Sequence, residues 1–453
     1  MNRRSFALLI KSLLVGASLA SRHSAHAAVQ NRDRVIVIGA GLAGLAAARK
    51  LKSLGHEVIV LEGRDRIGGR IHTSTQWSDF PIDLGASWIH ETTGNPLTAL
   101  ATEANAVLIT TRYADSVGYD TDGSEWTAAD ENQLSALRTQ VYDILGVAQN
   151  GDADQTLRQA LASLVGGGAP ADTRRLVNFL LSSEMETEYS GSANQLSTYW
   201  YDNGTGYSGP DKFFAAGYRV IIDHLATGLD IRTGKVVSNI DWSESEVRVT
   251  TSADAFTARR VLVTVPLGVL KMGQPIFTPP LPAAKLDAIT KLGMGLLNKC
   301  YLRFPSVFWP TNVDWIEYIP ATHGDWTEWV SFRKAMNKPV LMGFLAADIA
   351  AVKELLTDAQ IVASAMTVLR TIYGPSIPDP SSYQITRWAA DPFARGSYSF
   401  NAVNSTPAMR DALAAPINGR LFFAGEATEK TKYGTAHGAY LSGHRAANEM
   451  EVP

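Results

Sequence analysis

The sequence of 453 residues contains a single cysteine, Cys300. One thiol cannot form a disulfide within the chain, and no cluster of Cys and His has the spacing of a zinc module. A basic excess is also missing, because 41 Lys and Arg stand against 44 Asp and Glu. Proteins that bind nucleic acid through an electrostatic footprint need such an excess. A disulfide scaffold, a metal site and a nucleic-acid partner are therefore not expected.

The first 27 residues have the pattern of a secretory signal. Arg3 and Arg4 precede an apolar run from Ala7 to Ala20, and small residues follow at Ala25-His26-Ala27. Paired arginines before such a run resemble a twin-arginine export signal. We expect the twin-arginine machinery to export the chain to the periplasm or beyond, without stable membrane insertion after cleavage; an uncleaved anchor is the alternative. The segment holds four basic residues and no acidic one, so cleavage would change the net charge from -3 to -7.

The region after the signal has the order strand, glycine-rich turn, helix, strand and acid. Residues 35–38 are a β-branched run typical of a buried parallel strand, and an Ala- and Leu-rich stretch predicts a helix over 42–54. A second strand is expected over 58–61. Glu62 follows it directly. This order within one βαβ unit is typical of a dinucleotide-binding site.

Each glycine of the turn has a physical role. Gly39 makes the tight turn, Gly41 lets backbone N–H groups approach a pyrophosphate, and Gly44 lets the helix pack closely on the strand. The helix N-terminus offers partial positive charge to the phosphates. Glu62 is placed to accept hydrogen bonds from an adenosine ribose.

A second glycine-containing segment, Arg64-Asp65-Arg66-Ile67-Gly68-Gly69-Arg70, comes next. Its adjacent glycines allow another close backbone approach, and Arg70 can pair with a phosphate in bidentate fashion. Over 35–70 and 83–88 the sequence resembles the flavin-containing amine oxidases, which include polyamine oxidases, monoamine oxidases, L-amino-acid oxidases and lysine-specific histone demethylases. The resemblance implies non-covalent FAD, since Cys300 lies outside the C-terminal block where mitochondrial monoamine oxidases carry their attachment cysteine.

Separated blocks extend the resemblance through the chain. Residues 229–232 and 236–237 resemble the strand whose backbone holds the adenine in this family. Residues 420–426 lead to an acid whose counterpart binds the ribityl or diphosphate part, and residues 433–439 open a final helix. The resemblance implies that FAD contacts Gly39, Gly41, Gly44, Glu62, Arg64, Gly69, Arg70, Ser87, Trp88, Val237, Trp388, Gly425, Glu426, Thr435, Gly438 and Ala439.

These blocks predict an α/β fold of two discontinuous domains. A Rossmann-like FAD-binding domain of the glutathione-reductase type would comprise residues 28–94, 212–284 and 400–453. An α+β substrate-binding domain, with a mixed sheet and helices, would comprise residues 95–211 and 285–399. Within the second domain the pattern predicts one long helix over 350–373.

The expected chemistry rests on Lys299, Trp388 and Tyr433. Residues 293–299 resemble the block that carries the family's active-site lysine, which contacts the flavin through a water; without the resemblance, Lys299 would be an edge or surface residue. Trp388 and Tyr398 lie in blocks that line the family's catalytic cavity. Tyr433 takes the place of one wall of the aromatic pair around the substrate amine. Any of these aromatic residues could instead fill core.

Substrate choice is inferred from His90, Glu91 and Glu184. Mammalian-type polyamine oxidases have a histidine at the position of His90, and some plant polyamine oxidases have an acid near Glu91. Residues 183–188 contain three acids spaced two apart, and on a helix Glu184 and Glu188 would share a face. Such a carboxylate could fix the register of a long polycation; a solvated acidic turn is the alternative.

We therefore expect an FAD-dependent polyamine oxidase. It would oxidise an amine of a spermine- or spermidine-like substrate, reduce O2 to hydrogen peroxide and release an aldehyde and an amine. A monoamine or L-amino-acid oxidase on the same fold remains an alternative, as does a flavoprotein that binds polyamine without turnover. Histone demethylation is disfavoured, because an exported anionic protein has no route to chromatin. The sequence does not indicate the cleaved C–N bond or the oligomeric state.

Overall fold

The computed structural model describes residues 33–452. The predicted signal, residues 1–27, lies outside this range. Within the described part of the chain, no helix is both long and apolar enough to cross a membrane.

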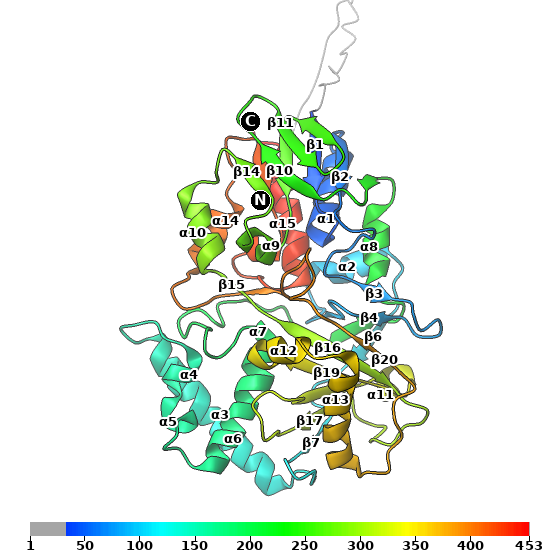
Figure 1. Cartoon of the computed structure of the whole chain (residues 1–453), viewed down its shortest axis with the longest axis vertical. Helices are drawn as coiled ribbons and strands as arrows, with labels where there is room; N and C mark the ends of the chain where they lie inside the picture. The colour runs from blue at the N-terminus through cyan, green and yellow to red at the C-terminus, as the bar shows by residue number, and fades with distance from the viewer. Residues whose placement is uncertain (1–32, 453) are drawn as a thin grey trace, which may run out of the picture. The chain divides into compact units, whose positions relative to one another are not determined.

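A five-stranded parallel sheet forms the centre of the first half of the fold (Figure 1). Its strands are, in spatial order, β22 (Leu421–Phe423), β13 (Arg260–Val263), β1 (Arg34–Ile38), β2 (Glu57–Leu61) and β9 (Asp230–Arg232). Val35 and Val37 belong to one hydrophobic cluster, whereas Ile36 and Ile38 belong to another. The sheet is therefore buried on both faces, which explains why its strands are continuously apolar.

Helices cover one face of this sheet and a second sheet covers the other. On the first face pack α1 (Leu42–Ser53), α2 (Pro96–Glu103), α8 (Arg219–Ala226) and α15 (Ala436–Glu449). Figure 1 shows the blue α1 beside the red α15, although they come from opposite ends of the described chain. The other face packs on β10 (Val237–Asp241), β11 (Val247–Thr251), β12 (Ala255–Ala258), β14 (Ile276–Thr278), α9 (Leu267–Lys271), α10 (Ala283–Lys291) and α14 (Pro407–Ala414).

A six-stranded mixed sheet forms the second half. Its spatial order is β20 (Ser382–Ile385), β16 (Leu297–Arg303), β19 (Val340–Ala346), β18 (Glu328–Ser331), β17 (Trp315–Tyr318) and β7 (Ser116–Tyr119). Its helices are α3 (Ala128–Gln149), α4 (Leu157–Ala160), α5 (Ala162–Val165), α6 (Ala171–Leu180), α7 (Thr187–Tyr189), α11 (Phe332–Met336), α12 (Ala347–Glu354) and α13 (Asp358–Tyr373), and a π-helical turn, η1 (Leu181–Glu186), joins α6 to α7.

Short elements complete the described chain. They are the pairs β3 (Thr73–Ser74) with β4 (Ile82–Asp83) and β15 (Gly293–Met294) with β21 (Ser399–Phe400), the three-stranded sheet of β5 (Trp88–Ile89), β8 (Asp211–Phe214) and β6 (Leu108–Thr111), and the 3-10 turn η2 (Glu426–Thr428).

The predicted α/β class with a Rossmann-like sheet and a mixed second sheet is confirmed. All five strands of the parallel sheet fall in the three segments predicted for the FAD-binding domain. Contacts join the described residues 33–452 into one compact unit, so the domain boundaries stay a prediction. The single helix expected over 350–373 is wrong: α12 ends at Glu354, and Thr357 starts α13 with a capping box to Gln360. A cap of this kind begins a new helix.

Candidate active site

A cavity of about 700 Å³ joins the two halves. Gly41, Glu62 and Val237 line it near the carboxyl ends of β1 and β2, while Lys299 and Trp315 line it from the six-stranded sheet. Ligands of open α/β sheets bind at the carboxyl ends of parallel strands. The fold therefore places a binding site where the turn after β1 predicted one.

The turn after β1 is shaped for a close ligand approach. Gly39 has φ of 106°, a conformation that L side chains rarely adopt. A Cβ at Gly44 would lie 2.0 Å from the carbonyl oxygen of Gly39, so α1 can sit this close to β1 only with glycine there. Gly41 leaves its cavity side open and, as the N-cap of α1, provides no side-chain hydrogen bond to the first N–H groups. Those N–H groups remain available to an anionic ligand.

Glu62 lies at the end of β2 and is buried. Its carboxylate accepts hydrogen bonds from the N–H of Ala40 at 2.8 Å and of Arg64 at 2.9 Å. Arg64 lines the cavity, but both terminal nitrogens of its guanidinium donate to Asp391 at 2.8 Å. A guanidinium already paired in this way contributes little net charge to a phosphate.

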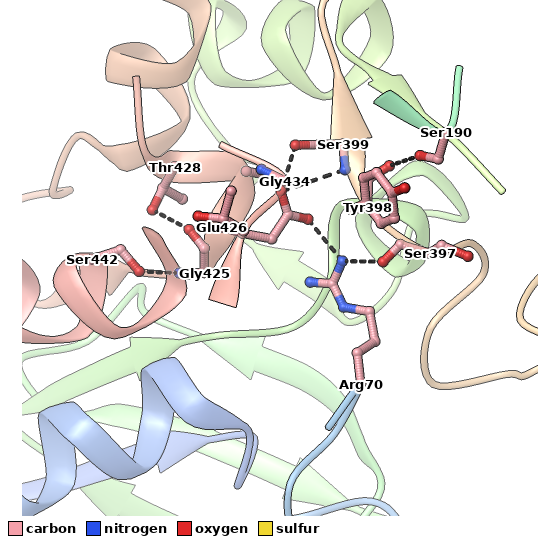
Figure 2. Close-up of polar contacts among 12 residues, drawn as sticks. Arg70, Ser190, Ser397, Tyr398, Ser399, Gly425, Glu426, Thr428, Gly434 and Ser442 are labelled. Carbon is pink, nitrogen blue, oxygen red and sulfur yellow. Dashed lines mark hydrogen bonds and ion pairs between the residues drawn. The ribbon is translucent and has the colours of Figure 1, made fainter. Parts of the chain in front are cut away.

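Arg70 is also paired within the protein (Figure 2). Its guanidinium donates to Glu426 at 2.7 Å and to the carbonyl of Ser397 at 2.8 Å. The other Glu426 oxygen accepts from the Ser399 hydroxyl at 2.6 Å and from the Gly434 N–H at 2.9 Å. Burial opposes ionisation, but the Arg70 charge and these hydrogen bonds hold the pKa of Glu426 below its usual value. Both bonds use Nη1 of Arg70, which thus orders the C-terminal block, and the expected phosphate contact stays a prediction.

The residues present fit a bound dinucleotide. The turn presents free N–H groups, and α15 begins at the cavity with Thr435 as its N-cap. The predicted cofactor residues that line the cavity are Gly39, Gly41, Glu62, Arg64, Gly69, Arg70, Ser87, Trp88, Val237, Trp388, Gly425, Glu426, Thr435 and Ala439. Gly44 and Gly438 lie behind the lining, where a Cβ at Gly438 would meet the Lys432 carbonyl oxygen at 1.9 Å.

Lys299 extends from β16 into a cage of oxygens. Its Nζ donates to the carbonyls of Asp83 at 3.1 Å and Gly85 at 2.5 Å, and to the Ser87 hydroxyl at 2.6 Å. Burial lowers the pKa of Lys299 to about 7, partly offset by the Asp83 carboxylate. The indole N–H of Trp388 donates to the carbonyl of Leu84 at 3.2 Å. One short segment, residues 83–87, therefore holds two of the three predicted catalytic side chains, Lys299 and Trp388.

Aromatic side chains line the cavity around this cage. Trp88 stacks on Trp315 with ring centroids 5.8 Å apart, and Trp315 stacks on Phe344 at 6.1 Å. The predicted substrate residue Tyr398 lines the cavity and donates its hydroxyl to the carbonyl of Thr187 at 2.6 Å. These four rings form the aromatic wall.

Tyr433 does not take the predicted place in that wall. It is absent from the cavity lining within the described residues, and the Arg410 guanidinium lies over its ring at 4.0 Å. Its hydroxyl donates to the carbonyl of Tyr201 at 2.8 Å. Arg410 therefore occupies one face of the Tyr433 ring, and the role of Tyr433 as a wall around the substrate amine stays a prediction.

The predicted substrate acids lie in unexpected places. Glu184 lies outside the cavity lining, and its carboxylate accepts from Arg138 at 2.6 Å and from Tyr142 at 3.1 Å. Glu188 lines the cavity. The π-helical turn η1 separates them, because its wider turn breaks the α-helical spacing that would place them on one face. Glu91 is outside the lining too, and its carboxylate accepts from the N–H of Tyr207.

His90 remains at the cavity as predicted. It lines the cavity, and its Nδ1 lies 2.9 Å from a carboxylate oxygen of Asp211. The stacked Trp88 ring lies 5.9 Å away.

Two buried glutamates close to the cavity were missed by the sequence reasoning. Glu317 of β17 and Glu328 of β18 are directly opposite in the antiparallel ladder, so their side chains share a face. Glu328 contacts the hydroxyl of Thr187, a cavity-lining residue, and accepts from Tyr113 at 2.7 Å. Burial raises the pKa of Glu317 to about 7 and of Glu328 to about 8. The only available signal was a glutamate inside each of two strand-like runs.

The comparisons with known proteins agree with this geometry. A model of flavin-containing amine oxidoreductases matches residues 42–450. Polyamine oxidase 2 of Arabidopsis thaliana is 36% identical over 434 residues, which cover 92% of this chain and 88% of that protein. The chain belongs to the flavin-containing amine oxidoreductase family. The predicted resemblance and the flavin cofactor are thereby confirmed.

Membership of the amine oxidoreductase family leaves the substrate open. Lysine-specific histone demethylase 1 homolog 2 of Arabidopsis thaliana is also 36% identical over 434 residues, although the chain spans only 58% of that longer protein. Among solved structures, a putrescine oxidase double mutant with redesigned cofactor binding matches with a TM-score of 0.74 over 93% of this chain and 99% of the other. At 20% identity this likeness shows the fold alone.

Proposed function

We propose that this amine oxidoreductase is a polyamine oxidase. The observation that carries the proposal is a carboxylate on the cavity wall: Glu188 lines the same cavity as Lys299. A substrate with two or more ammonium groups can place one near the acid while another nitrogen lies at the lysine end.

When bound, the flavin would supply the redox chemistry, accepting two electrons from the CH–NH group of the substrate and passing them to O2. The protein binds and orients the substrate. An aromatic ring on the cavity wall, such as that of Tyr398, can stabilise an approaching ammonium by about 0.5–2 kcal/mol. Lys299, with its pKa lowered to about 7 by burial, can exchange a proton with water in the cavity near neutral pH. The aromatic wall limits how much water surrounds the reacting nitrogen.

An amine screen tests the proposal. Hydrogen peroxide production is measured with spermine, spermidine, their acetylated forms, tyramine, L-amino acids and a methylated lysine peptide. We expect the highest kcat/KM with a polyamine. A higher value with tyramine or an amino acid would favour a monoamine or L-amino-acid oxidase, and turnover of the peptide alone would favour a demethylase. Tight spermine binding without anaerobic bleaching of the flavin would favour a binding protein.

A paired substitution tests the role of the acid. We expect Glu188→Gln to raise KM for spermine about tenfold, the effect of losing one charge-assisted hydrogen bond, with little change for tyramine. Glu184→Gln is the matched control, because Glu184 pairs with Arg138 away from the cavity. An unchanged spermine KM in Glu188→Gln would contradict the assignment.

We also propose that the protein is exported to the periplasm. The support is the Arg3-Arg4 pair, the apolar run after it and the small residues up to Ala27. Mass spectrometry of the periplasmic fraction should find a mature chain beginning at Ala28. Replacing Arg3 and Arg4 by lysine should leave the protein in the cytoplasm; undiminished export of that variant would contradict the twin-arginine route.

A further inference from the structure

The cage around Lys299 contains two kinds of oxygen. The carbonyls of Asp83 and Gly85 can only accept hydrogen bonds, whereas the Ser87 hydroxyl can accept one and donate one. An ammonium at Nζ has three N–H groups, one for each oxygen. A neutral amine has two N–H groups and a lone pair, so it can keep both carbonyls but needs a donor in the third place.

We propose that Ser87 is the residue that lets Lys299 change its charge inside the folded site. Its hydroxyl accepts from the ammonium and, after rotation about its own C–O bond, donates to the lone pair of the neutral amine. The proton that leaves Nζ passes to water in the cavity, which both side chains line. Ser87 is thus a positioning residue that acts through Lys299. The need for this charge change rests on the proposed oxidation, but the charge change itself can be measured without a substrate.

The two carbonyls cannot adjust in this way, because the backbone of residues 83–87 is fixed. A Cβ at Gly85 would lie 1.7 Å from the carbonyl oxygen of Arg70, which shows how tightly this segment is packed. The carbonyl of Asp83 also accepts from the Tyr301 hydroxyl at 2.7 Å. Rotation of one hydroxyl is therefore the least costly response to a proton leaving Nζ.

The charged surroundings of Nζ are simple. Asp83 is the one charged group that acts on the pKa of Lys299 among the described residues. Its carboxylate accepts from Thr73 at 2.5 Å and from the N–H of Tyr218 at 3.0 Å, and burial raises its pKa to about 6. Tyr301, on the same strand as Lys299, stays neutral because burial raises its pKa well above the usual value. Ser87 also hydrogen-bonds the carbonyls of Asp83 and Gly85 and the Tyr301 hydroxyl, but not the Asp83 carboxylate, so Lys299 is the one group among its partners that titrates near neutral pH.

The test measures the charge of Lys299 by NMR in the flavin-loaded protein. Lysine labelled with ¹³C at Cε reports protonation through its chemical shift, and the Lys299→Met variant identifies the signal. We expect Ser87→Ala to lower the pKa of Lys299 by about one unit, because a hydrogen bond to an ammonium is stronger than one to a neutral amine. Ser87→Thr keeps the hydroxyl and should restore the wild-type pKa.

Ser397→Ala is the matched control. Its hydroxyl also lies at the cavity, but it bonds the backbone of Leu297 and not Nζ, so the pKa of Lys299 should not move. Ser87→Cys covers the case in which the alanine variant does not fold, and should shift the pKa in the same direction. The pH limb of kcat/KM that depends on Lys299 should move with the NMR titration.

A wild-type pKa in both Ser87→Ala and Ser87→Cys would overturn the proposal. So would a shift that Ser87→Thr does not reverse, because it would then reflect altered packing and not the hydroxyl. Failure of every polyamine in the amine screen would overturn the proposed substrate but leave this titration unaffected, so the two hypotheses fail separately.

Discussion

The cofactor end and the substrate end of the cavity are built by different means. The cofactor end is a local structure, in which Gly39, Gly44 and Glu62 act within one βαβ unit and mostly through backbone atoms. At the substrate end, Lys299, Glu328 and Thr187 come from elements distant in sequence, and strand pairing and side-chain contacts bring them near one cavity. The first end should therefore fail when a side chain is added at one of its close-packed glycines. The second should change its chemistry while the fold persists.

The largest expected effect is at the cofactor end. Gly44→Val would place its Cβ 2.0 Å from the carbonyl oxygen of Gly39 and force α1 away from β1. We expect purified protein without flavin absorbance and a loss of about 2–3 kcal/mol in the free energy of unfolding. Absorbance spectra and urea titration measure both. Gly146→Ala is the control, since a Cβ there meets nothing within 4 Å and should leave flavin content unchanged. Normal flavin content in Gly44→Val would remove the contrast between the two ends.

Lys299→Met should have the next largest effect, and it should spare the fold. We expect reduction of the flavin by an amine or its reoxidation by O2 to slow at least tenfold, equivalent to about 1.4 kcal/mol in the barrier. Stopped-flow absorbance measures the two half-reactions separately. Lys291→Met is the control, because Lys291 pairs with Asp287 on α10. Wild-type rates in both half-reactions would exclude a catalytic role for Lys299.

The same contrast explains what the sequence could predict. The strand over 35–38, the helix start at Leu42 and the acid at Glu62 follow from local periodicity and glycine geometry, and the structure places them accordingly. The predictions for Tyr433 and Glu184, in contrast, depended on how a local segment of the chain turns. Arg410 occupies one face of the Tyr433 ring, and the π-helical turn separates Glu184 from Glu188. Neither a cation from a distant helix nor a widened turn has a signature in a single sequence.

The missed residues show the same limit more sharply. Glu317 and Glu328 become neighbours only through the register of β17 on β18. A one-residue shift of that register would turn one of the glutamates to the opposite face. Sequence pattern alone does not fix the register of strands joined by an irregular loop. The pairing of Arg70 with Glu426 could not be predicted either, because the two residues are 356 positions apart and only the fold brings them together.

Glu317 allows a smaller test at the substrate end. Because burial raises its pKa from 4.5 to about 7, the folded protein binds this proton more tightly than the unfolded protein does. The stability that the protonated group provides is complete below about pH 4.5 and is lost as the pH rises through 7. We therefore expect the unfolding free energy of Glu317→Gln, measured against that of the wild type, to be about 1–3 kcal/mol more favourable at pH 9 than at pH 5.

Urea titrations at the two pH values measure this difference. Glu246→Gln changes an exposed residue on the loop before β11, and its unfolding free energy should follow the same pH profile as that of the wild type. A parallel pH profile for wild type and Glu317→Gln would mean that Glu317 is ionised without cost in the folded state. The substrate end would then be less sensitive to side-chain chemistry than the comparison requires.

The smallest expected effect concerns Cys300, the neighbour of Lys299 on β16. Its thiol is buried, and burial raises its pKa, so it stays protonated and is a poor nucleophile. Acid or heat precipitation of the wild type should release all flavin into the supernatant, because the thiol is absent from the cavity lining among the described residues. Cys300→Ala should keep full flavin content and lose only about 1 kcal/mol of stability from the small void. Yellow colour retained in the precipitate of the wild type but not of the variant would show a covalent link, and would mean that the cofactor is held by a side chain of the substrate half and not by backbone geometry alone.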